Sequence, residues 1–131
     1  MTANGSVSRD LSDRLDFVGL GKAERDALRQ AKPVITASLD GALETFYKKA
    51  TVHPVTAKFF SSDAHVKSAK SRQVKHWEKI AGADFDAGYV EAVTAIGRVH
   101  ARLGLEPRWY IGGYSMIVES IVRAVVEKHL D

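Results

Sequence analysis

Apolar side chains recur in this sequence at steps of three and four residues. The clearest run occupies positions 35, 39, 43, 46, 47 and 50. Because an α-helix repeats every 3.6 residues, these side chains share one face of a helix. No segment shows the alternate spacing of a half-buried β-strand. The chain is therefore predicted to be all-α, with about five substantial helices.

Prolines and glycines divide this pattern into segments. Pro33 lacks a backbone N–H and restricts the residue before it, so we expect one helix to end there and the next to start. Pro54 is expected to end that second helix. The later helices are expected to start at Ser62 or Asp63, to run from about Tyr89 to Leu103, and to open again at about Arg108 after the break at Gly104 and Pro107.

Composition narrows the class of protein. The 131 residues suit one domain, and 45% hydrophobic with 27% charged residues is ordinary for a globular chain. Lys and Arg number 19 against 16 Asp and Glu, which is too balanced to favour nucleic-acid binding. The sequence has no cysteine and no apolar run long enough to insert in a membrane, and we expect no signal peptide because residues 1–10 contain no apolar run. A cytoplasmic location is the default expectation.

The two ends of the chain differ in character. Residues 1–13 are small and polar, and we expect a flexible lead there, followed by one domain over 14–131. Apolar residues within 14–20 indicate a short helical turn packed on the body of the domain. They are Leu15, Phe17, Val18 and Leu20.

His100 stands out because it continues an apolar stripe. It follows Val93 by seven residues and Ile96 by four, so it shares their helix face. A buried imidazole is either a core residue bonded to a backbone carbonyl or a ligand, and haem iron commonly takes one neutral imidazole. Gly97 and Ala101 are small enough to let a flat macrocycle approach the helix. Spacing alone leaves both interpretations open.

Tyr47 presents the same choice on the 35–50 stripe. Its ring is expected to point inward, and a buried phenol needs a hydrogen-bond partner. It is either a core tyrosine or a donor to a gas held on the open side of an iron.

Three segments carry a family resemblance. FYKKA at 46–50, KHWEKIAG at 75–82 and IGRVHARLGLEPRWYIGGY at 96–114 resemble the globin-coupled sensors, which are haem-binding, protoglobin-like sensor globins. The resemblance implies a globin-like helical sandwich that holds haem b (iron protoporphyrin IX). It implies that His100 is the proximal iron ligand and Tyr47 the distal donor. The other residues expected at the cofactor are Phe46, Phe60, Trp77, Ile96, Trp109 and Tyr110.

The resemblance also implies a function without catalysis. The domain would sense dioxygen or another diatomic gas and regulate a C-terminal output module such as a chemotaxis transducer, histidine kinase or diguanylate cyclase. Relatives dimerise through their last helices, so a homodimer is expected, and Val118, Val122 and Val126 give the last helix a second apolar face. The alternatives are a histidine phosphotransfer bundle, suggested by HARLG at 100–104, and a cofactor-free helical dimerisation module.

Two features depart from the family pattern. Arg72 stands where some relatives have a hydroxyl residue, and we expect its charged end to reach solvent. The family fold also has one more long helix after the last helix expected here, so the domain is expected to lack the final globin helix.

Overall fold

The computed structural model describes the backbone of residues 2–130 and the side chains of residues 9–130. It confirms the all-α prediction, and no strand occurs within that range. The elements are α1 (Thr2–Phe17), α2 (Lys22–Ala50), the 3-10 turn η1 (Ala57–Phe59), α3 (Asp63–Ala81), α4 (Ala87–Leu103) and α5 (Pro107–Leu130). None of the helices in this part of the chain combines the length and apolar content needed to cross a membrane.

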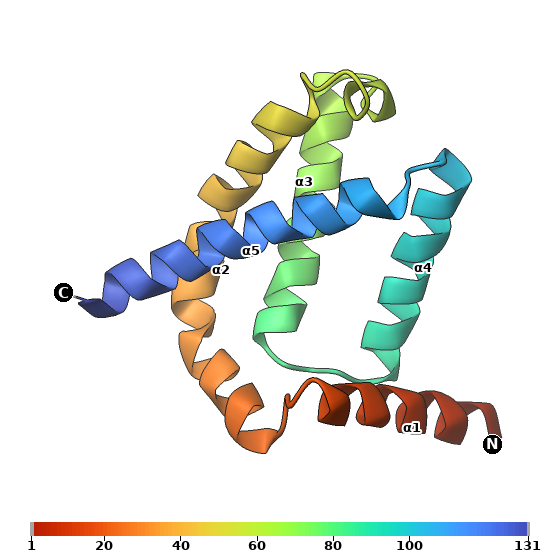
Figure 1. Cartoon of the computed structure of the whole chain (residues 1–131), viewed down its shortest axis with the longest axis vertical. Helices are drawn as coiled ribbons and strands as arrows, with labels where there is room; N and C mark the ends of the chain where they lie inside the picture. The colour runs from red at the N-terminus through yellow and green to blue at the C-terminus, as the bar shows by residue number, and fades with distance from the viewer. Residues whose placement is uncertain (1, 131) are drawn as a thin grey trace.

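Three helices build the hydrophobic core. The apolar stripe of α2 packs against α3 on one side and against α5 on the other. Figure 1 shows α5 crossing α2 and α3 at a steep angle, so that the three helices meet around the middle of α2. The buried core residues are Ile35, Leu39, Ala42, Leu43, Tyr47, Trp77, Ala81, Ile117 and Ile121.

Helix α4 lies at the edge of this arrangement. In Figure 1 it stands on the opposite side of α3 from α2, and its N-terminal end lies next to α1. None of its residues is fully buried. The helix is nevertheless well delimited, because Asp86 caps its first turn by accepting a hydrogen bond from the Tyr89 N–H at 2.8 Å. Gly104, at φ +74°, ends it in the left-handed conformation that glycine tolerates best.

Pro33 does not separate two helices as predicted. Helix α2 runs without interruption from Lys22 to Ala50 with Pro33 inside it, and its ribbon bends along its length in Figure 1. Proline costs a helix one hydrogen bond and introduces a kink. Here both halves pack on the same core, through Leu28 before the proline and Ile35 after it. This shared packing keeps the halves in one helix, which propensity alone does not predict.

The N-terminal helix is longer than the short turn predicted within 14–20. Helix α1 spans Thr2–Phe17. Leu11 and Leu15 lie one turn apart and are both half-buried, a spacing the sequence already contained. Two of the expected anchors do not pack, since Phe17 is 90% exposed and Val18 is 69% exposed.

Candidate functional site

Tyr47 lies in an aromatic cluster between α2 and the η1 connector. Its side chain is 6% exposed. The ring of Phe46 meets it edge-on at a centroid distance of 4.9 Å, and the ring of Phe60 does so at 5.7 Å. The inward orientation expected from the α2 stripe is therefore confirmed, and the two neighbouring rings restrict the motion of the phenol.

Gln73 connects Tyr47 to Trp77. The Gln73 Nε2 donates to the Tyr47 hydroxyl oxygen at 3.0 Å, and the Trp77 Nε1 donates to Gln73 Oε1 at 3.3 Å. Burial raises the pKa of Tyr47 above its ordinary value of 10.0, while the Gln73 hydrogen bond and the charge of Arg72 oppose that rise. Tyr47 is thus a neutral hydroxyl at physiological pH. Gln73 was not among the site residues predicted from the sequence, although a polar residue on a buried helix face needs a hydrogen-bond partner.

His76 forms a second polar contact in the same region. Its Nε2 lies 3.1 Å from the Tyr114 hydroxyl, and its ring is parallel to that of Tyr89 at 6.4 Å. Burial lowers the pKa of His76 below its ordinary value of 6.5. The imidazole nitrogen is already engaged with Tyr114, so His76 is a structural residue at the junction of α3, α4 and α5.

Arg72 lies at the surface, as expected. Its Nη1 donates to Ser68 Oγ at 2.9 Å, one turn earlier on α3.

His100 lies near the end of α4, beside the start of α5. Its half-buried ring stacks on Tyr110 with centroids 5.0 Å apart and ring planes 20° from parallel. Burial lowers the pKa of His100 below its ordinary value of 6.5, so the imidazole is neutral at pH 7. Neutral imidazole is the form that binds transition metals. A half-buried, stacked ring does not match the exposed histidine that phosphotransfer requires.

The α4 face around His100 is less buried than its spacing predicted. Val93 is 39% exposed and Leu103 is 52% exposed, whereas Ile96 and His100 are half-buried. The main helix partner of α4 is α1, not the α2–α3–α5 core. The expectation of a core-facing stripe was wrong because spacing tells which side chains share a face, but not whether another helix covers that face.

Trp109 lies next to Tyr110 in sequence but in different surroundings. Its ring lies 5.2 Å from that of His53, and the Arg108 guanidinium lies over it at 5.0 Å. Its Nε1 is buried and has no hydrogen-bond partner within the described part of the chain. A buried donor without a partner is uncommon and marks a position where an acceptor from a ligand would be stabilising.

The predicted site residues thus form two groups. Phe46, Tyr47, Phe60 and Trp77 lie around α2 and α3, whereas Ile96, His100, Trp109 and Tyr110 lie on α4 and the first turn of α5. Helix α5 contacts both groups, since Tyr110 stacks on His100 and Tyr114 lies 5.4 Å from Trp77 one turn later. No hydrogen bond or aromatic pair between described residues joins Tyr47 directly to His100.

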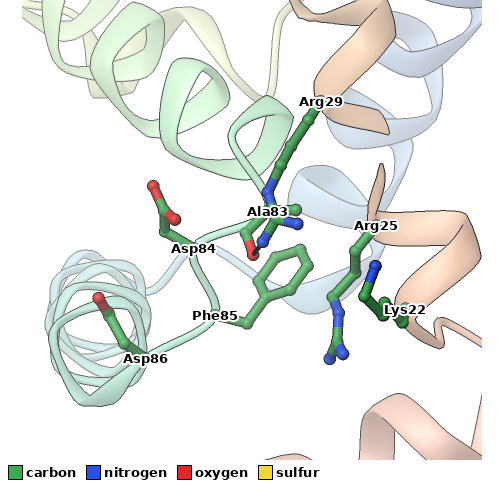
Figure 2. A pocket seen from close by; sticks show the side chains of 7 residues that line it. All are labelled: Lys22, Arg25, Arg29, Ala83, Asp84, Phe85 and Asp86. Atoms are coloured by element: carbon green, nitrogen blue, oxygen red, sulfur yellow. Dashed lines mark hydrogen bonds between the residues drawn. The ribbon is translucent and has the colours of Figure 1, made fainter. Parts of the chain in front are cut away.

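The groove in Figure 2 is a separate feature. It has a volume of about 440 Å³ and lies between the first turns of α2 and the loop before α4. Arg29 reaches over Ala83 there and donates to the carbonyl oxygens of Gly82 at 3.0 Å and Ala83 at 3.4 Å. None of the predicted site residues lines this groove, and Arg29 serves to hold the α3–α4 loop against α2. Its lining residues are Lys22, Arg25, Arg29, Ala83, Asp84, Phe85 and Asp86.

The all-helical arrangement agrees with comparisons to known proteins. The sequence profile of the Protoglobin family matches residues 7–131. The chain belongs to the Protoglobin family. Its fold is accordingly a globin-like all-α fold, as predicted.

One curated relative of this protoglobin domain is the "Heme-based aerotactic transducer HemAT" of Halobacterium salinarum. The two are 24% identical over 124 residues, which is 94% of this chain and 25% of the relative. The chain therefore spans about a quarter of the length of that relative.

The residues around His100 fit a haem group. A single neutral imidazole on an otherwise apolar helix face is the donor that a haem iron takes from a protein. One turn before it, a Cβ added at Gly97 would meet no atom within 4 Å, so the helix backbone is accessible to a flat ligand there.

Proposed function

We propose that this protoglobin domain binds haem b through His100 and senses dioxygen or another diatomic gas. The observation that carries the proposal is the neutral, half-buried imidazole of His100, stacked on Tyr110 within a chain of the Protoglobin family. The name of the archaeal relative, a heme-based aerotactic transducer, supports the same function. The domain would act by binding alone, so that signalling would follow from occupancy of the site rather than from a catalysed reaction.

Each group of site residues has a distinct part in this function. A haem iron supplies an open coordination position for the gas. His100 would hold the iron, and Tyr110 orients the imidazole by stacking on it. Phe46, Phe60, Trp77 and Ile96 would supply apolar surface that excludes water, and the Trp109 Nε1–H would bind an acceptor of the porphyrin.

Tyr47 is the proposed hydrogen-bond donor to the gas. Its hydroxyl is neutral, buried and attached to a ring that Phe46 and Phe60 hold in place. Such a donor would stabilise a gas that carries partial negative charge, as dioxygen on a haem iron would, more than nearly nonpolar carbon monoxide. The site would therefore favour dioxygen over carbon monoxide.

Output from the domain is proposed to pass through α5. This helix touches both groups of site residues, through Tyr110 and Tyr114. Its outer face carries Val118, Val122 and Val126, which are 44%, 52% and 46% exposed. We expect these valines to form a homodimer interface, so that a shift of α5 changes the contact between two copies and the output of a chemotaxis transducer, histidine kinase or diguanylate cyclase.

A titration with haemin tests the proposal. The wild-type protein should acquire a Soret absorption band with one haem per chain, and His100→Ala should lose it. His129→Ala is the matched control, because His129 is exposed near the end of α5 and should not affect the band. A band that survives in His100→Ala and disappears in another histidine variant would show that the iron ligand is assigned to the wrong residue.

A further inference from the structure

A chain of three hydrogen-bonded side chains connects α3 to α2. It runs from Trp77 through Gln73 to the hydroxyl of Tyr47. We propose that Gln73 is a positioning residue that determines the direction in which the Tyr47 hydroxyl donates its proton. This inference rests on the proposed function, because it concerns the donor for the gas.

The indole of Trp77 determines the orientation of the Gln73 amide. An indole N–H can only donate, so the Gln73 atom that faces it at 3.3 Å must be the carbonyl oxygen. Trp77 is buried and lies one helical turn after Gln73, which keeps this pair together. The usual ambiguity between the oxygen and nitrogen of a glutamine amide is thereby removed.

The orientation of the amide in turn determines the role of the phenol oxygen. With Gln73 Oε1 turned toward Trp77, the group that faces Tyr47 is the NH2, which can only donate. The Tyr47 oxygen therefore accepts this hydrogen bond at 3.0 Å. A phenolic O–H lies close to the plane of its ring, so the proton must point away from the occupied side of the oxygen.

Neighbouring groups leave that proton available. Arg72 is a cation bonded to Ser68 and accepts no hydrogen bond, and the ring nitrogen of His76 contacts Tyr114. None of the hydrogen bonds among the described residues uses the Tyr47 hydroxyl as the donor. Gln73 therefore preorganises Tyr47 as a donor whose proton has no competing acceptor among the described residues.

Two substitutions at Gln73 separate positioning from packing. Gln73→Glu keeps the shape, but an ionised carboxylate would accept from both Trp77 and Tyr47 and so withdraw the Tyr47 proton from the gas. Gln73→Leu removes both hydrogen bonds and leaves the hydroxyl free to rotate. Circular dichroism and thermal unfolding should first establish that both variants fold, and Tyr47→Phe serves as the reference for complete loss of the donor.

The first measurement uses the apoprotein. Phenolate absorbance during an alkaline titration, assigned by difference from Tyr47→Phe, reports the pKa of Tyr47. Because the Gln73 hydrogen bond lowers that pKa, Gln73→Leu should raise it, and the negative charge of Gln73→Glu should raise it further. An unchanged Tyr47 pKa in both variants would overturn the proposed contact whether or not the domain binds haem.

The second measurement uses the haem-loaded protein above about pH 8, where the introduced carboxylate is ionised. Gln73→Glu should speed dioxygen release as much as Tyr47→Phe, on the order of 5–30-fold, with little change for carbon monoxide. Gln73→Leu should have a smaller effect. If Tyr47→Phe speeds dioxygen release and Gln73→Glu does not, the positioning role is wrong. If Tyr47→Phe itself has no effect, the proposed function of Tyr47 is wrong instead.

Discussion

A buried glycine on α5 should be sensitive to a single added methyl group. Gly113 lies where α5 packs against Phe46 of α2. A Cβ at this position would lie 2.9 Å from Cε2 and 3.3 Å from Cζ of Phe46. The Phe46 ring is itself held by its edge contact with Tyr47, at 4.9 Å between centroids. Gly113→Ala therefore requires Phe46 or the helix axis to move by several tenths of an ångström.

The magnitude follows from two opposing effects. Replacing glycine by alanine inside a helix stabilises it by about 0.8–1 kcal/mol. Overpacking a core by one methyl group costs about 1–3 kcal/mol. Gly112 is the matched control, because it is the preceding residue of the same helix and a Cβ there meets no atom within 4 Å. Gly112→Ala should stabilise the protein, and Gly113→Ala should be about 1–3 kcal/mol less stable than Gly112→Ala.

Urea unfolding followed by circular dichroism measures this difference directly. A difference of about 1–3 kcal/mol in the free energy of unfolding corresponds to a gap of roughly 3–15 °C between the thermal unfolding midpoints of the two variants. The gap should shrink when both alanine variants are made in a Phe46→Leu background, since the ring that the methyl group meets is then absent. Equal stability of Gly112→Ala and Gly113→Ala in the wild-type background would refute the close packing of α5 on Phe46.

Four further predictions concern function and solution behaviour. Tyr47→Phe in the haem-loaded protein should speed dioxygen release on the order of 5–30-fold in stopped-flow measurements, because a hydrogen bond worth about 1–2 kcal/mol is lost, and should leave carbon monoxide release nearly unchanged. His76 has a pKa below 6.5 in the folded state, so stability should fall as the pH drops below that value, and His76→Gln should reduce this slope in urea unfolding at a series of pH values. A leucine at Gly97 would have open space, so Gly97→Leu should leave the free energy of unfolding unchanged or raise it. The same side chain should weaken haem binding. Gly41→Leu is the control, because Gly41 also lies on open helix surface and its substitution should not affect the haem titration. Val122→Asp should shift sedimentation toward a monomer, whereas the exposed control Lys128→Asp should not, and a wild-type protein that is monomeric at micromolar concentration would contradict the proposed interface.

Much of the fold was accessible from the sequence because helices are local. The stripe from Ile35 to Ala50, the cap at Ser62 and the stop at Gly104 all depend on residues a few positions apart in the chain. Each was predicted correctly, since hydrogen bonding and side-chain direction within a helix depend on neighbours in the chain. The inward orientation of Tyr47 followed from the same stripe.

The sequence also contained signals that only the structure explains. Gln73 interrupts an apolar stripe, and that pattern by itself indicates a buried polar partner without naming it. The partner proved to be Tyr47, 26 positions earlier and on another helix. Likewise, the closeness of Gly113 to Phe46 depends on how α5 crosses α2, which no local pattern contains.

Local sequence determined which residues are helical, where most helices end and which side chains share a face. The tertiary structure decided that α2 continues through Pro33 and that the His100 face of α4 lies outside the α2–α3–α5 core. These outcomes depend on the packing of distant segments. Burial requires two surfaces that meet. The free energy of burying apolar side chains on either side of Pro33 therefore depends on residues far away in the sequence, and so does the lack of such burial along α4.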